Sequence, residues 1–174
     1  MTTVTVVKKD GRIAIAADTL TKWGGGKESA DYVANHEKII CVGDSFVAIT
    51  GSATFKLILA DYFSSLDVPP QFDSAADIFR VWNTMHGVLK EHYYLQTGED
   101  KEEDLESSRM DVLIANPRGI FGVAAHRTVQ EFSRFYAYGS GSSYALGAMY
   151  AAWRAPSLDA EALYLQLREA VRGL

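Results

Sequence analysis

The sequence predicts a four-layer αββα sandwich, an α+β fold in which two antiparallel sheets pack face to face and a helix pair covers each sheet. Runs of strands alternate with runs of helices, in the order strands, two helices, strands, two helices. This order argues against alternating βαβ units. The chain has 174 residues, a length that suits one domain, and no Pro/Gly/Ser-rich linker divides its halves. We therefore treat residues 1–174 as a single domain.

The N-terminal strands form the clearest local pattern. Residues 3–9 and 12–18 are rich in β-forming side chains and are joined by Asp10-Gly11, a dipeptide that favours the positive φ angles of a tight hairpin turn. Residues 13–17 are apolar on both faces, as expected of a strand that is covered on each side. The next predicted segments are a loop over residues 21–26 and a second hairpin over residues 39–42 and 46–50.

Helices and further strands follow in order. Residues 53–65 carry apolar side chains at helical spacing, and Pro69-Pro70 ends this segment. Ser74 and Asp77 form a capping box for a helix that runs to about Leu95. The remaining predicted elements are strands over residues 110–115, 120–125 and near 131–138, and helices over residues 144–153 and 158–171.

The charge of the chain is concentrated in one stretch. Seventeen basic and 22 acidic side chains give a net charge of −5, and residues 99–106, with six acids and one base, hold the whole excess. The remainder is neutral and has no basic cluster, so binding to nucleic acid or to an anionic membrane surface is not expected. The acidic stretch is either a solvated loop or a contact surface for a neighbouring copy or another partner.

Other compositional features exclude further classes. Cys41 is the only cysteine, which excludes an intramolecular disulfide framework and a cysteine-based zinc cage. No uninterrupted apolar run approaches the ~18 residues that span a bilayer. The N-terminus lacks the charged start and apolar centre of a secretion signal. We expect a cytoplasmic protein without a membrane partner.

Several catalytic motifs fail when tested. Residues 139–144 open like a dinucleotide fingerprint, but Tyr144 replaces the third glycine. Residues 50–54 do not match Gly-x-Ser-x-Gly, and no phosphate-binding loop occurs. The histidines have no zinc-type spacing; they are His36, His86, His92 and His126. We expect neither a metal nor a cofactor.

Thr2 offers a different chemistry. If Met1 is removed, the α-amine of Thr2, with an ordinary pKa of about 7.7–8.0, can take the proton of its own hydroxyl. Asp18 ends a strand paired with the first one, and Lys38 leads into the next strand. An ammonium near the hydroxyl would favour its deprotonated form, and a carboxylate would balance that ammonium. The alternative is that both charges are simply solvated at strand ends, and spacing alone favours this alternative.

Residues 2–7 and 13–18 resemble the opening of proteasome β-subunits and of HslV-type bacterial peptidases. Three further segments fit the same pattern in the same order, namely residues 37–39, 50–53 and 139–145. The resemblance extends from Thr2 to about the helix after Pro156. It implies the N-terminal nucleophile hydrolase fold and the activity of a threonine-type endopeptidase.

The resemblance also implies roles for individual residues. Thr2 would be the nucleophile and its amine the base. The resemblance further implies that Lys38 lowers the effective pKa of the hydroxyl, Asp18 orients Lys38, Gly51 binds the oxyanion through its N–H, Ser140 positions the amine and its water, and Ile49, Thr50 and Lys22 bind substrate.

Members of this family assemble as two face-to-face rings of six or seven subunits. The resemblance therefore implies polypeptide substrates, a homo-oligomeric double ring and a ring-shaped ATPase unfoldase as partner. No cofactor is implied.

The sequence departs from the family pattern in two places. Family members carry a closing segment with an Asp and often a Ser after the last helix, whereas residues 161–174 match that helix and no closing segment follows. With Met1 attached, the nitrogen of Thr2 would be an amide and could not act as a base. These departures leave two other hypotheses open: a non-catalytic or unprocessed ring subunit on the same fold, and an amidohydrolase of the same class that acts on a small amide.

Overall fold

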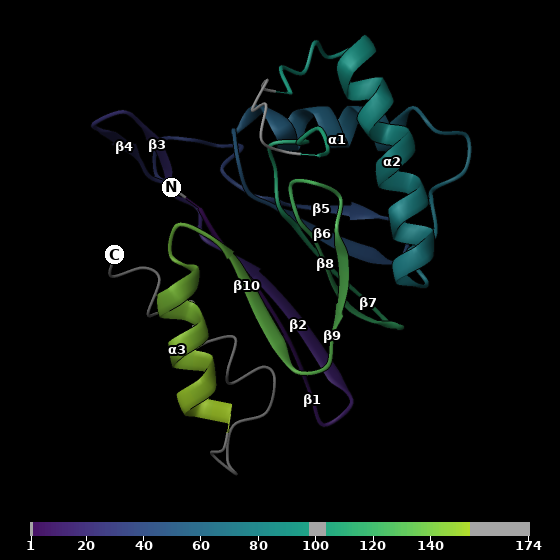
Figure 1. The fold of residues 1–174 in the computed structure, drawn as a ribbon. Helices are drawn as coiled ribbons and strands as arrows, with labels where there is room; N and C mark the ends of the chain where they lie inside the picture. The colour runs from purple at the N-terminus through teal and green to yellow at the C-terminus, as the bar shows by residue number, and fades with distance from the viewer. Residues whose placement is uncertain (1, 98–103, 154–174) are drawn as a thin grey trace.

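The computed structural model of the chain describes residues 2–97 and 104–153 (Figure 1). Its first elements are strands β1 (Thr3–Lys9) and β2 (Arg12–Ala17), which pair as the predicted hairpin. Asp10 and Gly11 take φ angles of 52° and 75°, the two positive values that a two-residue type I′ turn requires. Strand β10 (Phe135–Gly139) pairs with the other edge of β1, so the first sheet has the order β10-β1-β2.

The second sheet has five antiparallel strands in the order β5-β6-β7-β8-β9. Each strand pairs with the next one along the chain. Short connections join β5 to β6, β7 to β8 and β8 to β9, whereas residues 50–111 lie between β6 and β7. The predicted pairs at residues 39–50 and 110–125 are both confirmed. The strands are β5 (Ile39–Val42), β6 (Ser45–Ile49), β7 (Val112–Asn116), β8 (Gly119–Val123) and β9 (Val129–Phe132).

The prediction of a single strand near residues 131–138 was wrong. Strand β9 ends at Phe132 and β10 begins at Phe135. Strand β9 pairs with β8 in the five-stranded sheet, whereas β10 pairs with β1 in the three-stranded sheet. Ser133 and Arg134 therefore carry the chain from one sheet to the other, and a continuous strand could not do so.

The prediction of a loop over residues 21–26 was also wrong. Strands β3 (Thr21–Trp23) and β4 (Gly26–Glu28) form a small two-stranded sheet beside the N-terminus. Gly24 takes a φ of 56° in the turn between them. Two glycines between strands are a hairpin signal as well as a loop signal, and here they form the hairpin turn.

Helices α1 (Thr54–Ser64) and α2 (Ala75–Glu91) lie together over the five-stranded sheet (Figure 1). The predicted cap of α2 is confirmed, because the N–H of Asp77 donates to Ser74 Oγ at 3.2 Å. Helix α2 ends at Glu91 and not near Leu95. Tyr94 takes a φ of 55°, and this left-handed residue turns the chain away from the helix axis.

Three apolar layers hold the sandwich together. Strand β7 shows how they form, because Val112 and Ile114 face α1 and α2, whereas Leu113 and Ala115 face the other sheet. On the far side, helix α3 (Ser142–Trp153) covers the three-stranded sheet through Ala145 and Met149. The four layers confirm the predicted αββα sandwich.

Some predictions fall on residues that the structure does not describe. Residues 1, 98–103 and 154–174 lie outside the described part of the chain. The structure therefore does not test the helix predicted over residues 158–171, the predicted lack of a closing segment, the attachment of Met1 or most of the acidic stretch. Within residues 2–97 and 104–153, no helix combines the length and the apolar character needed to cross a bilayer.

Candidate active site

Thr2 directly precedes β1, beside the turn that joins β10 to α3. Gly139 has a φ of 95°, and a Cβ atom there would overlap the carbonyl oxygen of Thr2. A Cβ atom on Gly141 would overlap Thr3 Oγ1. Both glycines are therefore needed because the N-terminal strand passes directly against this turn. Sequence reasoning noted this run as a failed dinucleotide motif and as part of the family resemblance, but did not predict the close approach; a Gly-x-Gly directly after a strand was the signal for it.

The carboxylate of Asp18 is surrounded by three donors. The backbone N–H of Thr3 donates to Oδ1 at 2.6 Å and that of Leu20 donates to Oδ2 at 3.2 Å. The ammonium of Lys38 donates to Oδ2 at 3.0 Å. The Lys38 and Asp18 side chains are 13% and 10% exposed. The pair is thus largely removed from water, and the interpretation of two independently solvated charges was wrong.

Lys38 connects the pair to the segment after β2. Its Nζ also donates to the carbonyl oxygen of Leu20 at 2.6 Å. Burial lowers the pKa of Lys38 below its ordinary value, Asp18 opposes this shift, and the nearby charge of Lys56 adds to it. The Lys38 ammonium is thus bound by two oxygens, and it loses its proton more easily than the ammonium of a free lysine does.

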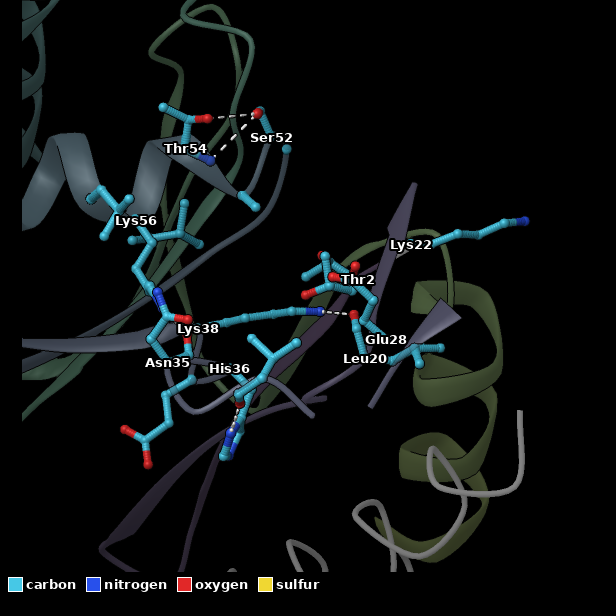
Figure 2. Close-up of a pocket in the computed structure, with 17 residues that line it drawn as sticks. Thr2, Leu20, Lys22, Glu28, Asn35, His36, Lys38, Ser52, Thr54 and Lys56 are labelled. Atoms are coloured by element: carbon cyan, nitrogen blue, oxygen red, sulfur yellow. Dashed lines mark hydrogen bonds between the residues drawn. The ribbon is translucent and has the colours of Figure 1, made fainter. Parts of the chain in front are cut away.

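A pocket of about 410 Å³ opens beside these groups. Three of the predicted catalytic residues line it, namely Thr2, Lys38 and Gly51. Figure 2 shows the Lys38 side chain running toward Thr2 and Leu20. The volume lies within the usual range for small-ligand sites, ~300–1,000 Å³.

Two of the predicted substrate-binding residues also line the pocket, Ile49 and Lys22. Ile49 ends β6 and is 4% exposed. Lys22 is exposed on β3, and its ammonium points away from Thr2 in Figure 2. Thr50 is not among the residues that line the pocket, because its hydroxyl lies against the backbone of Asp111 at 3.1 Å.

Gly51 occupies the turn between β6 and α1. Its φ of 104° lies in the region that favours glycine. A Cβ atom there would lie 2.8 Å from the carbonyl oxygen of Arg109 and 3.2 Å from the ring of Phe55. Only glycine therefore fits this turn, whose backbone lines the pocket.

Comparison with solved structures connects the fold and the pocket to a family. The structure of Thiobacillus denitrificans BPH in complex with epoxomicin matches at 85% sequence identity with a TM-score of 0.88, over 93% of this chain and 85% of that chain. A second structure of Thiobacillus denitrificans BPH matches at 86% identity with a TM-score of 0.89, over 93% of this chain and 84% of that chain. Eukaryotic HslV from Trypanosoma brucei has the same fold, with a TM-score of 0.66 at 14% identity over 96% of this chain and 88% of that chain.

The chain belongs to the proteasome/HslV-type family of N-terminal nucleophile hydrolases. The resemblance found in the sequence is thereby confirmed. No protein-family model and no curated protein sequence matches the chain.

Ser140 also contacts Thr2 in this proteasome/HslV-type chain. Its hydroxyl donates to the carbonyl oxygen of Thr2 at 3.4 Å, a long hydrogen bond. The structure thus places Ser140 next to Thr2. Its predicted role at the Thr2 amine stays a prediction.

Sequence reasoning missed three charged residues of the pocket, Glu28, Glu37 and Lys56. Lys56 lies on α1, lines the pocket and donates to the carbonyl oxygen of Asn35. The sequence around Lys56 gave no sign that it reaches the pocket, because its contact with Asn35 joins segments that are 21 residues apart. Among residues 2–97 and 104–153, no group of three or more His, Cys, Asp or Glu side chains is arranged to hold a metal ion.

Proposed function

We propose that this chain is the subunit of a self-compartmentalised threonine endopeptidase that cleaves polypeptides through an acyl-enzyme at Thr2, once Met1 is removed. The observation that carries this proposal is the buried Lys38–Asp18 pair, whose lysine lines the same pocket as Thr2 and Gly51. The 85% identity to a chain whose structure contains epoxomicin, a proteasome inhibitor, supports it.

The proposed reaction begins with the free amine of Thr2, which takes the proton of the Thr2 hydroxyl. The oxygen then attacks the carbonyl carbon of the scissile peptide bond, and the carbonyl electron pair moves onto its oxygen. Lys38 favours the deprotonated hydroxyl through its positive charge. Asp18 keeps that cation in place and also binds the N–H of Thr3, the residue next to the nucleophile.

The N–H of Gly51 would bind the oxyanion, a contribution of about 3–4 kcal/mol in other acyl-transfer enzymes. Collapse of the intermediate breaks the C–N bond, and the leaving amine takes the proton from the Thr2 ammonium. The resulting ester is cleaved by a water molecule, with the Thr2 amine again as base and Ser140 beside it. Ile49 would contact an apolar substrate side chain and Lys22 would lie at the pocket rim.

The proposal includes assembly into two face-to-face rings of six or seven subunits, which would enclose the Thr2 residues, and delivery of unfolded polypeptides by a ring ATPase. The family membership supports ring formation. Native mass spectrometry of the purified protein tests this part, since a double ring predicts twelve or fourteen copies.

The direct test of the chemistry is incubation with epoxomicin, followed by intact mass and peptide mapping. We expect Met1 to be absent and one inhibitor adduct on Thr2, with none in the Thr2→Ala variant. Protein that lacks Met1 and still forms no adduct would overturn the enzyme proposal. Retention of Met1 in protein purified from its own source would favour a non-catalytic or unprocessed ring subunit. Hydrolysis of small amides but not of peptides would indicate an amidohydrolase.

A further inference from the structure

The position of the Gly51 N–H depends on the residue before it. This N–H belongs to the peptide plane that also contains the carbonyl group of Thr50. Gly51 itself has no side chain to hold it. Whatever holds Thr50 therefore also fixes the orientation of the proposed oxyanion donor.

Thr50 is held by three hydrogen bonds to one residue, Asp111. The N–H of Thr50 donates to the carbonyl oxygen of Asp111 at 2.9 Å. The Thr50 hydroxyl donates to the same oxygen at 3.1 Å and accepts from the Asp111 N–H at 3.2 Å. Thr50 is 5% exposed. The contact lies one residue beyond the last ladder pair of β6 and β7, Ile49 with Val112, so it extends their pairing to the edge of the pocket.

Asp111 is in turn fixed from both sides. Its Oδ1 accepts from the N–H of Ala125 at 3.0 Å. Two residues earlier, the carbonyl oxygen of Arg109 lies against Gly51. Arg109 has a φ of 56°, unusual for a residue with a side chain, and its N–H donates to Ser107 Oγ at 3.0 Å. The segment from Ser107 to Asp111 thus follows the Gly51 turn closely.

The start of this segment is anchored on α2. The ring of His86 lies between Ser108 Oγ, at 2.9 Å from Nδ1, and Glu106 Oε2, at 3.1 Å from Nε2. Lys90 pairs with Glu106 at 2.7 Å, and Arg127 donates to the carbonyl oxygen of Glu106 at 2.7 Å. Ser108 is 1% exposed, so its contact with His86 is closed to solvent and anchors the chain.

We propose that Thr50 and Asp111 form a clamp that positions the Gly51 N–H for oxyanion binding, so that Thr50 is a positioning residue and not a substrate-binding one. The inference rests on the proposed function of Gly51. Valine has the same shape as threonine but no hydroxyl. Thr50→Val would therefore remove the two hydrogen bonds of the Thr50 hydroxyl and keep the bond from the Thr50 N–H to Asp111.

The chain offers a matched control at the opposite end of the same two strands. Ser45 begins β6, is 2% exposed, and its Oγ accepts from Asn116 Nδ2 at 3.2 Å. Ser45→Ala therefore removes a buried hydroxyl that joins β6 to β7 far from the pocket. Comparison of Thr50→Val with Ser45→Ala separates loss of stability from loss of positioning.

Peptide hydrolysis and hydrogen exchange test the clamp together. We expect Thr50→Val to lower kcat roughly ten- to a hundredfold with KM nearly unchanged, since small misplacements of catalytic groups have effects of this size. Thr50→Ser, which keeps the hydroxyl, should restore kcat. Ser45→Ala should lower the unfolding temperature and leave kcat at the wild-type value. Amide exchange in a peptide that covers residues 50–52 should accelerate in Thr50→Val alone.

An unchanged kcat and unchanged exchange in folded Thr50→Val would overturn the clamp, as would an equal loss of kcat in Ser45→Ala. Should Thr50→Val not fold, Thr50→Ala replaces it, because a smaller side chain leaves room for a water molecule at the lost hydroxyl. An inactive wild-type protein whose Thr50→Val variant still shows faster exchange would contradict the proposed function and leave the positioning contact supported.

Discussion

At the residue scale, Lys38 combines burial with an ion pair. Its ammonium is matched by the Asp18 carboxylate, yet its pKa lies below the ordinary value because burial outweighs the pairing. Removing one partner of such a pair leaves an uncompensated charge, which costs about 3–5 kcal/mol in buried pairs. The pair is therefore vulnerable to single substitutions, and its charge state can be followed through the pH dependence of the reaction.

The first prediction concerns this pH dependence. If the cation is needed for attack, kcat/KM falls at alkaline pH as Lys38 loses its proton, with a midpoint below the ordinary lysine pKa of 10.5. The charge of Lys56 lowers the pKa of Lys38. Lys56→Met should therefore shift the alkaline limb of the profile to higher pH.

The control is Lys27→Met on the exposed strand β4, which should leave the limb in place. The measurement is the rate of peptide hydrolysis from pH 7 upward. A limb that moves to lower pH in Lys56→Met would show that Lys38 does not govern it.

At the element scale, the turn between β10 and α3 is built against the start of β1. The two overlaps that a Cβ atom would make, at Gly139 and Gly141, involve Thr2, which directly precedes β1, and Thr3, its first residue. The position of Thr2, the proposed nucleophile, is therefore set by a turn that lies at the other end of the described chain.

The second prediction compares two glycines of this region. Gly141→Ala should destabilise the protein by about 1–3 kcal/mol, because the added methyl group meets Thr3 Oγ1 in a packed interior. Gly147→Ala, in the exposed middle of α3 with nothing within 4 Å of the new Cβ, should stabilise it by about 0.5–1 kcal/mol through helix propensity. Denaturant unfolding of both variants measures the difference, and equal stabilities would contradict the close approach.

The third prediction concerns the anchor between α2 and the segment before β7. Burial lowers the pKa of His86, and the charges of Arg127 and Lys90 lower it further, whereas Glu106 opposes the shift. The unfolded state then binds more protons than the folded state at pH values below the ordinary histidine pKa of 6.5. Stability should therefore be complete above about pH 6.5 and decrease as the pH falls below it.

His86→Gln should remove this part of the pH dependence of the free energy of unfolding. His92→Gln, at the end of α2, should retain it. Urea unfolding at several pH values between about 5 and 7.5 measures both. A wild-type protein that becomes more stable over this range as the pH falls would show that the sign is wrong.

At the scale of the whole molecule, one apolar layer joins the two sheets. It consists of residues from both, among them Val6, Leu113 and Ile120, which are fully or almost fully buried. Strand β7 lies at the centre of the five-stranded sheet and contributes to two layers. The geometry of the pocket depends on this layer because Thr2 precedes a strand of one sheet and Gly51 follows a strand of the other.

The fourth prediction tests that layer. Leu113 has no exposed surface, so Leu113→Ala should cost about 3 kcal/mol of the free energy of unfolding. Leu105→Ala, at a side chain that is 61% exposed, should cost less than about 0.5 kcal/mol. Denaturant unfolding measures both, and a small effect at Leu113 would mean that the sheets do not depend on this contact.

The sequence alone predicted the layers and most of the strands, because those follow from local patterns. Asp10-Gly11 specifies a turn, and alternating apolar residues specify which face of a strand is buried. The break at Ser133-Arg134 could not be predicted, since it depends on which sheet each neighbouring strand joins. The same holds for the site. Thr2, Asp18 and Lys38 came from motif order, whereas the contact of Thr50 with Asp111 joins residues that are 61 positions apart, and no local pattern specifies it.

The contact of Thr2 with the pocket has a practical consequence for recombinant work. Thr2 lines the pocket and is followed at once by β1, so any polypeptide fused ahead of it would begin at the pocket itself. Under the proposed function, an N-terminal affinity tag would occupy the substrate pocket and convert the amine of Thr2 into an amide. Protein for kinetic assays should be released from such a tag by a protease that leaves Thr2 as the first residue, and Edman degradation can verify this before any rate is measured.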